Sequence, residues 1–136
     1  MRNILKIMLI DDDPINNLIS RETIRHFDPA IDVVEYDKPD EALEYLTTQS
    51  KLRTQNIPDV IFLDLNMPLI NGWSFLDEYK HILQFFNTDI ELFLLTSSIN
   101  HKDIQKAQSF PIITHYISKP LTVRVLEKIK NDQAPY

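Results

Sequence analysis

The stretch ILKIMLIDDDP, residues 4–14, sets an almost continuous apolar run directly before three acidic residues and a proline. Such a run is typical of a parallel β-strand that is covered on both faces. A proline suits the first turn of a helix, where its missing N–H group costs nothing, and Asp13 can cap that helix. The stretch therefore predicts a buried strand, a polar turn and a helix, in that order.

The same succession of a short apolar run and a longer mixed segment recurs along the whole chain, which is typical of βαβ units. Strands are predicted at residues 4–10, 33–36, 60–63, 92–95 and 116–117. We expect an α/β doubly wound (βα)5 fold with both faces of its parallel sheet covered. The strand order 2-1-3-4-5 is taken from the flavodoxin-like version of that fold.

Helices are predicted between these strands from caps and from helical spacing of apolar residues. The first spans residues 14–27 and has an apolar face at Ile15, Leu18 and Ile19. The second begins at a cap at Asp37 and runs through Leu46, and the third begins at a cap at Asn71 and runs to about Phe86. The last two span residues 101–108 and 122–131. The polar stretch 47–56 is interpreted as an extended helix end or a surface loop.

The composition excludes several classes of function. The 136 residues fit one globular domain, and the net charge of −6 argues against nucleic acid as a direct partner, because phosphate binding depends on clustered Lys and Arg. Gly72 is the single glycine, so the glycine-rich phosphate loops are excluded. No apolar run approaches the roughly 20 residues of a membrane span. With no cysteine and no secretory signal, we expect a cytoplasmic protein without membrane insertion.

Polar side chains follow four of the five predicted strands. They are Asp11, Asp12 and Asp13 after the first strand, Asp64 and Asn66 after the third, Thr96 and Ser97 after the fourth, and Lys119 after the fifth. Ligands of open α/β sheets bind at this edge. In the expected strand order the two acidic groups face each other, with Thr96 and Lys119 approaching from the other side.

These residue types fit one kind of chemistry. Carboxylates in close quarters repel each other, and all-oxygen ligands favour Mg²⁺ or Mn²⁺ as the ion that relieves the repulsion. A carboxylate can attack phosphorus to form an acyl phosphate. A lysine and a threonine can stabilise the charge of the transferring group. The strand ends therefore predict metal-dependent phosphoryl transfer to an aspartate.

Four motifs carry a family resemblance: MLIDDDP at 8–14, VIFLDLNMPLINGW at 60–73, LFLLTSS at 92–98 and HYISKP at 115–120. In this order and spacing the chain resembles a response regulator receiver domain of two-component signalling, from Lys6 to about Lys130. The resemblance implies a phosphoacceptor signalling domain and not an enzyme. It implies a sensor histidine kinase or histidine phosphotransfer protein as donor and an effector protein downstream. We expect one receiver domain over residues 1–136, with a core of about 4–131 and no output domain.

The resemblance also implies a role for each acidic residue. Asp64 matches the phosphoacceptor, which also faces the metal. Asp12 matches the acid that binds Mg²⁺ directly, and Asp11 the acid that usually acts through a water. Asn66 is expected to contribute its backbone carbonyl to the metal.

A second group of implied roles concerns the response to phosphorylation. Thr96 matches the hydroxyl residue that moves toward the phosphoryl group, and Lys119 the lysine that pairs with that group. Tyr116 matches an aromatic switch on the face formed by the fourth helix, fifth strand and fifth helix. The bond between Lys119 and Pro120 is a candidate for the cis form.

Three other interpretations remain open on the sequence. A magnesium-dependent phosphohydrolase typically needs a second acid two residues after its nucleophile, where this chain has Asn66. A receiver-like scaffold that is never phosphorylated usually lacks an acid, the threonine or the lysine. Simple cation binding by the acidic triplet lacks the ligand spacing of a calcium loop.

Overall fold

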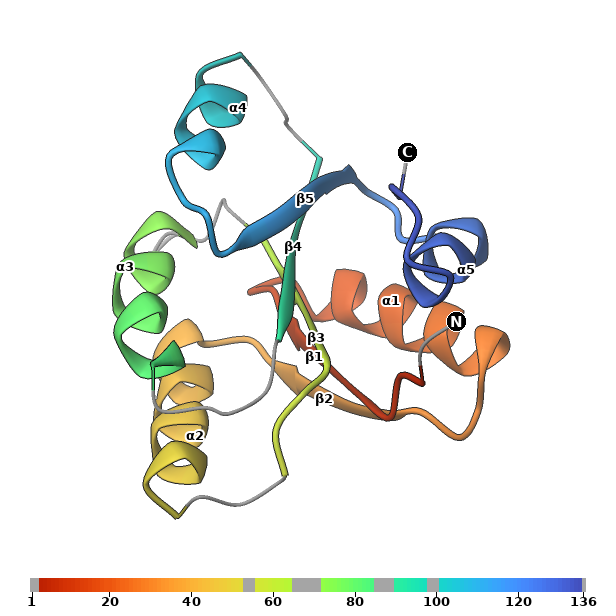
Figure 1. Cartoon of the computed structure of the whole chain (residues 1–136). Helices are drawn as coiled ribbons and strands as arrows, with labels where there is room; N and C mark the ends of the chain where they lie inside the picture. Colours follow the sequence, from red (N-terminus) through yellow and green to blue (C-terminus); the bar gives the residue numbers. More distant parts are fainter. Residues whose placement is uncertain (1–2, 53–55, 65–71, 85–89, 98–100, 136) are drawn as a thin grey trace.

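The computed structural model of the chain describes residues 3–52, 56–64, 72–84, 90–97 and 101–135 (Figure 1). Within these residues five strands alternate with five helices. In chain order they are β1 (Lys6–Ile10), α1 (Pro14–Phe27), β2 (Asp32–Tyr36), α2 (Pro39–Leu52), β3 (Val60–Leu63), α3 (Gly72–Leu83), β4 (Glu91–Thr96), α4 (His101–Gln108), β5 (Ile113–Ser118) and α5 (Val123–Lys130). The predicted alternation is confirmed.

All strand pairs are parallel, and the order across the sheet is β2-β1-β3-β4-β5. This is the flavodoxin-like order, so the expected fold class is confirmed. None of the described helices is long and apolar enough to cross a lipid bilayer.

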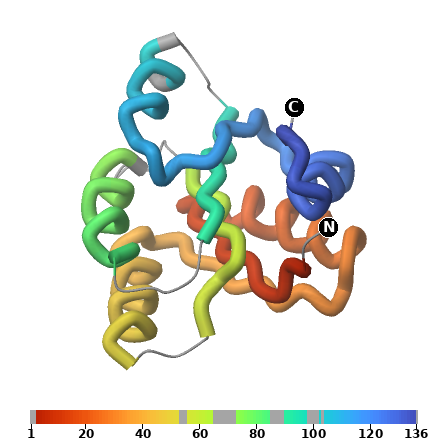
Figure 2. Tube along the Cα trace, in the orientation of Figure 1, coloured from red at the N-terminus to blue at the C-terminus, as the bar shows by residue number. Residues whose placement is uncertain are grey.

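The two faces of the sheet bury alternate residues of each strand. Met8 and Ile10 of β1 belong to one core cluster, which α2 and α3 cover, whereas Ile7 and Leu9 belong to the other, which α1 and α5 cover. Figures 1 and 2 show the two helix pairs on opposite sides of the sheet, with α4 on the side of α2 and α3. Because both faces are covered, the inner strands are apolar over most of their length, with Lys6, Glu91 and Thr96 only at strand ends.

Several element boundaries differ from the prediction, among them those of β1 and α2. β1 begins at Lys6, because Ile4 is buried but precedes the hydrogen-bonded ladder. α2 continues past Leu46 to Leu52 and buries Ser50, whose hydroxyl donates to the Thr47 carbonyl at 2.7 Å. The predicted cap at Asn71 lies outside the described residues.

β5 spans six residues, Ile113–Ser118, where only residues 116–117 were predicted. It is an edge strand that pairs with β4 alone, and its Thr114 and Ser118 side chains are exposed. A search for continuous apolar runs misses such a strand, because Thr114, His115 and Ser118 interrupt its apolar residues.

The apolar face predicted for α1 is not the buried one. Ile15 is 65% exposed, and Leu18 and Ile19 are each 45% exposed. The helix instead buries Asn17, Ser20 and Ile24 against the sheet.

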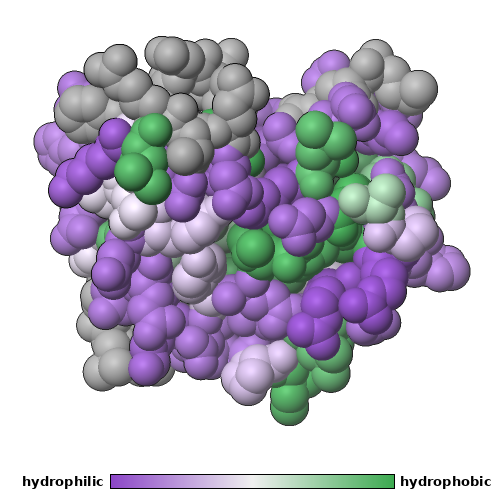
Figure 3. Space-filling view, turned by 90° about the horizontal axis from the view of Figure 1, so that it is seen from below, coloured by the Kyte–Doolittle hydropathy of each residue, from purple (hydrophilic) through white to green (hydrophobic). Residues whose placement is uncertain are grey.

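Apolar side chains are also exposed at the end of the molecule where β3 and β4 begin. Figure 3 shows apolar side chains there interspersed with hydrophilic ones. Leu5 before β1 and Leu52 at the end of α2 are exposed at 63% and 64%. The exposed apolar residues of α1, in contrast, recur at i, i+3 and i+4 spacing.

Candidate functional site

The turn between β1 and α1 is held by hydrogen bonds at each of its ends. The Asp11 N–H donates to the Tyr36 carbonyl of β2 at 3.1 Å. One Asp11 carboxylate oxygen, Oδ1, accepts from the Asp13 N–H at 2.9 Å, and Asp13 Oδ1 accepts from the Ile15 N–H at 2.9 Å. Asp13 is therefore the N-cap of α1, as predicted, and the turn has a fixed shape.

Three carboxylates meet at the ends of β1 and β3. Oxygens of Asp11, Asp12 and Asp64 all lie within 4.8 Å of one another. The Asp64 N–H donates to the Ile10 carbonyl at 2.9 Å, which extends the pairing of β3 with β1 by one residue and brings the acids together. Asp11 and Asp64 are each only 7% exposed.

Lys119 reaches this cluster from the end of β5. Its Nζ atom lies 2.7 Å from Asp11 Oδ2 and 3.5 Å from Asp64 Oδ2. Its backbone N–H donates to the Thr96 carbonyl at 3.0 Å, and the bond to Pro120 is cis, as expected. Thr96 ends β4 and is 1% exposed.

The charges of the cluster do not balance. Burial, and next the Asp11 carboxylate, raise the pKa of Asp12 above its ordinary value, while Lys119 acts in the opposite direction. Three carboxylates face one ammonium group, so negative charge is in excess. A divalent cation with oxygen ligands, Mg²⁺ or Mn²⁺, fits this arrangement in charge and in ligand type.

The predicted site residues divide into three groups by position. Asp11, Asp12, Asp64 and Lys119 are brought together, with Thr96 joined to Lys119 through the backbone. Tyr116 lies apart from the acids, half-buried in β5 against the core cluster that contains Ala107 of α4. Asn66 lies outside the described residues.

Asn17, a buried residue next to the turn, was not predicted from the sequence. The Asn17 side chain is 4% exposed and donates from Nδ2 to the Asp11 carbonyl at 2.9 Å. A signal was present, because Asn17, Ser20 and Ile24 share one helix face by their spacing. The face with Ile15, Leu18 and Ile19 is more apolar, so the spacing of apolar residues favoured that face as the buried one.

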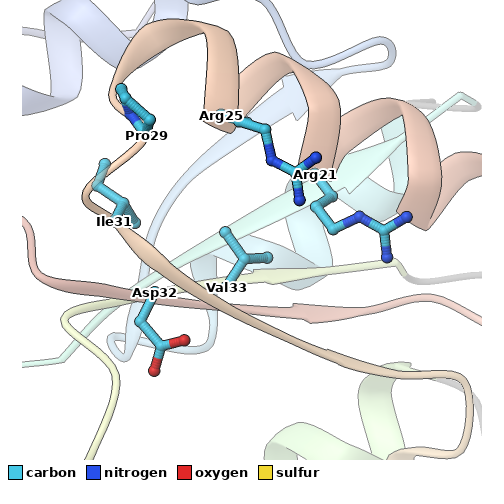
Figure 4. A pocket seen from close by; sticks show the side chains of 6 residues that line it. All are labelled: Arg21, Arg25, Pro29, Ile31, Asp32 and Val33. Carbon is cyan, nitrogen blue, oxygen red and sulfur yellow. The ribbon is translucent and has the colours of Figure 1, made fainter.

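A hollow of about 230 Å³ lies elsewhere, between the second half of α1 and the start of β2. Figure 4 shows Arg21 and Arg25 extending over Val33 on one side of the strand, with Asp32 turned to the other. Arg21 pairs with Glu35 at 2.7 Å and Arg25 with Glu22 at 3.2 Å. Because both guanidinium groups already have carboxylate partners, this hollow is a weaker candidate than the acidic cluster.

Comparison with known proteins agrees with the fold. The sequence model of the response regulator receiver domain matches residues 7–130. The chain therefore belongs to the response regulator receiver domain family, a class of signalling domain in two-component systems.

Two solved structures are similar over nearly their whole length. A two-component response regulator from Cytophaga hutchinsonii is 31% identical, with a TM-score of 0.85, and the match covers 96% of this chain and 97% of that one. The phosphorylated cyanobacterial phytochrome response regulator RcpA is 27% identical, with a TM-score of 0.72 and coverages of 96% and 91%.

A curated relative is much longer than this chain. The sensor histidine kinase CheAY of Helicobacter pylori is 28% identical over 123 residues, which are 90% of this chain. The chain spans about 14% of the length of that relative.

Proposed function

We propose that the chain accepts a phosphoryl group on Asp64 from a phosphohistidine of a sensor kinase or phosphotransfer protein, in a reaction that requires Mg²⁺. The observation that carries this proposal is the convergence of three carboxylates and one ammonium group at the ends of β1, β3 and β5. The family membership supports it, as does the similar structure that contains a phosphorylated response regulator.

The proposed step uses the Asp64 carboxylate as the nucleophile. One of its oxygens forms a bond to phosphorus while the bond between phosphorus and the donor imidazole nitrogen breaks. The electron pair of that bond returns to the nitrogen, which is protonated by solvent. The product is a phospho-aspartate, an acyl phosphate.

Each remaining group of the site has a proposed part in this step. Asp11, Asp12, Asp64 and the Asn66 carbonyl would hold Mg²⁺, which supplies positive charge to the phosphoryl oxygens. Lys119 leaves Asp11 to pair with the phosphoryl group. The Thr96 hydroxyl, at the end of β4, moves to donate to one of its oxygens.

The exposed apolar face of α1 supports a protein as the donor. Ile15, Leu18 and Ile19 lie within the first turns of α1, directly after the acidic turn. A partner that brings a histidine to Asp64 has to pass over these turns. An apolar stripe at i, i+3 and i+4 spacing is the form in which one helix packs on another. We therefore infer that the donor presents an apolar helical surface to α1.

Output is proposed to act through α4, β5 and α5. Tyr116 of β5 packs on the same core cluster as Ala107 of α4. Movement of Thr96 toward the phosphoryl group changes the space beside β5, which favours a second position of the tyrosine ring. Phosphorylation would then bias two arrangements of one surface that an effector protein reads.

The test is the intact mass of the protein after incubation with Mg²⁺ and acetyl phosphate, beside an Asp64→Asn variant. We expect the wild type to gain one labile phosphoryl group and the variant to gain none. Modification of both proteins would remove Asp64 from its role. If neither protein gains mass while both are folded, the chain is an unphosphorylated scaffold. Turnover of phosphate esters by the wild type would instead indicate a phosphohydrolase.

A further inference from the structure

Asn17 places a buried amide directly under the acidic turn. It faces the sheet on α1 and is 4% exposed, while its neighbour Leu18 is exposed to solvent. A buried polar side chain costs stability unless it is hydrogen-bonded, and Asn17 Nδ2 donates to the Asp11 carbonyl at 2.9 Å. The backbone N–H of Asn17 also donates, to the Asp13 carbonyl at 3.2 Å. Asn17 thus contacts the turn at both ends.

The hydrogen bond from Asn17 to the Asp11 carbonyl fixes the position of more than the carbonyl oxygen. This carbonyl belongs to the planar peptide unit that joins Asp11 to Asp12, so holding its oxygen fixes the orientation of the whole unit. The Asp11 carboxylate has its own anchors in the Asp13 N–H and the Lys119 ammonium. The Asp12 side chain leaves the far end of the same peptide unit, and its direction follows that of the plane.

We propose that Asn17 is a positioning residue for the metal site, a role that rests on the proposed function. It touches neither the metal nor the phosphoryl group. By holding the peptide between Asp11 and Asp12, it keeps their carboxylates within 4.8 Å of Asp64 before any cation arrives. Residues that orient metal ligands typically change metal affinity by about 10- to 100-fold when they are replaced.

The competing explanation is that Asn17 only satisfies a loop carbonyl and contributes to general stability. Ser20 offers a matched control for this. Ser20 is only 6% exposed, and it lies on the same face of α1, one turn further along the helix. No hydrogen bond joins Ser20 to the acidic turn in the part of the chain that the structure describes. Ser20→Ala therefore perturbs the same helix face without touching the turn.

The experiment is a thermal-unfolding titration with MgCl₂, starting from EDTA-treated protein, for wild type, Asn17→Leu, Asn17→Ala and Ser20→Ala. The melting temperature without metal reports stability, and its rise with Mg²⁺ reports the dissociation constant for the ion. We expect both Asn17 variants to bind Mg²⁺ about tenfold more weakly or worse. Ser20→Ala should keep the affinity of the wild type. Asn17→Ala serves if the leucine variant does not fold.

The rate of phosphorylation by acetyl phosphate provides a second readout. An Asn17 variant should need more Mg²⁺ for half-maximal rate and recover most of the wild-type rate at saturating Mg²⁺. Folded Asn17 variants that bind Mg²⁺ as tightly as the wild type would show that the positioning role is wrong, with the proposed function intact. A wild-type protein that neither binds Mg²⁺ nor gains a phosphoryl group overturns both.

Discussion

At the scale of single residues, the acidic cluster holds more negative charge than Lys119 can neutralise. The pKa of Asp12 is raised by burial and then by Asp11. A carboxyl whose pKa is higher in the folded state favours folding while it is protonated, below its ordinary pKa. That contribution is lost as the pH rises through the raised value, so at neutral pH the ionised Asp12 opposes folding.

Neutralising Asp12 should therefore stabilise the metal-free protein. We expect Asp12→Asn to raise the melting temperature at pH 7 in EDTA, because it removes one of three mutually repelling carboxylates. In Mg²⁺ the order should reverse, since the wild type alone keeps the full ligand set. Asp13→Asn, which loses a charge outside the cluster and can still cap α1, should have little effect in either buffer. A lower melting temperature for Asp12→Asn in EDTA would contradict the repulsion.

The hydroxyl group of Tyr79 is a buried polar group without a hydrogen-bond partner in the described residues. Tyr79 is completely buried, and its ring stacks on Phe75 with centroids 5.6 Å apart. Burial raises the pKa of this phenol well above its ordinary value. The hydroxyl has lost its water without a replacement.

Tyr79→Phe should consequently leave the free energy of unfolding unchanged or raise it by up to about 1 kcal/mol. Tyr45→Phe is the matched control, because that hydroxyl donates to the Asn56 carbonyl at 2.7 Å and accepts from Lys6 Nζ at 2.8 Å. Its loss should cost about 1–2 kcal/mol. Urea unfolding of both variants measures the difference. A larger loss for Tyr79→Phe than for Tyr45→Phe would show that the first hydroxyl is satisfied.

At the scale of elements, α4 is attached to the rest of the protein through few apolar residues. Among its described side chains Ala107 is buried and Ile104 half-buried. Its end is held by Trp73, in the first turn of α3. The Trp73 ring stacks on Phe110 with centroids 5.6 Å apart, and Lys106 Nζ lies 4.8 Å from the centre of the same ring. The tryptophan therefore joins α3 to α4 and to the turn before β5.

Removing this contact should loosen α4 more than the other helices. Trp73→Ala is expected to cost about 2–4 kcal/mol and to speed amide hydrogen exchange in α4 and in the turn after it. Lys106→Gln removes the cation and keeps the ring contact, so it should cost only about 0.5–1 kcal/mol. Exchange in α2 serves as the internal reference. Equal acceleration in α2 and α4 would mean that Trp73 contributes to global stability alone.

At the scale of the whole molecule, the sheet assembles a site from residues that are far apart in the chain. The ion pair between Lys119 and Asp11 joins residues 108 positions apart. A cation bound among Asp11, Asp12 and Asp64 would therefore connect β1 to β3, and it would bind the folded state alone.

Mg²⁺ should accordingly raise the melting temperature of the whole protein in proportion to the logarithm of its concentration, above the dissociation constant. Chelation with EDTA should reverse the rise. Asp64→Asn, which removes a carboxylate from the cluster, should show a weaker response at the same Mg²⁺ concentrations. A response that is identical in the two proteins would place the bound ion elsewhere.

Much of the fold and of the candidate site could be predicted because both depend on residue type at strand ends. The apolar runs located the inner strands, and the four strand-end groups brought Asp11, Asp12, Asp64 and Lys119 into one prediction. The motifs predicted the family from Lys6 to about Lys130, and the sequence model of the family matches residues 7–130. The structure brings these four residues together, but their roles and those of Asn66, Thr96 and Tyr116 remain predictions.

The sequence by itself determined the alternation of elements and the residue types that follow each strand, since apolar runs and capping residues act locally. Tertiary structure alone decided the extent of β5, the inward face of α1 and the contact between Asn17 and Asp11. Spacing along a helix shows which residues share a face, but burial depends on what packs against that face. For α1, the sheet covers Asn17, and Ile15 stays exposed at 65%.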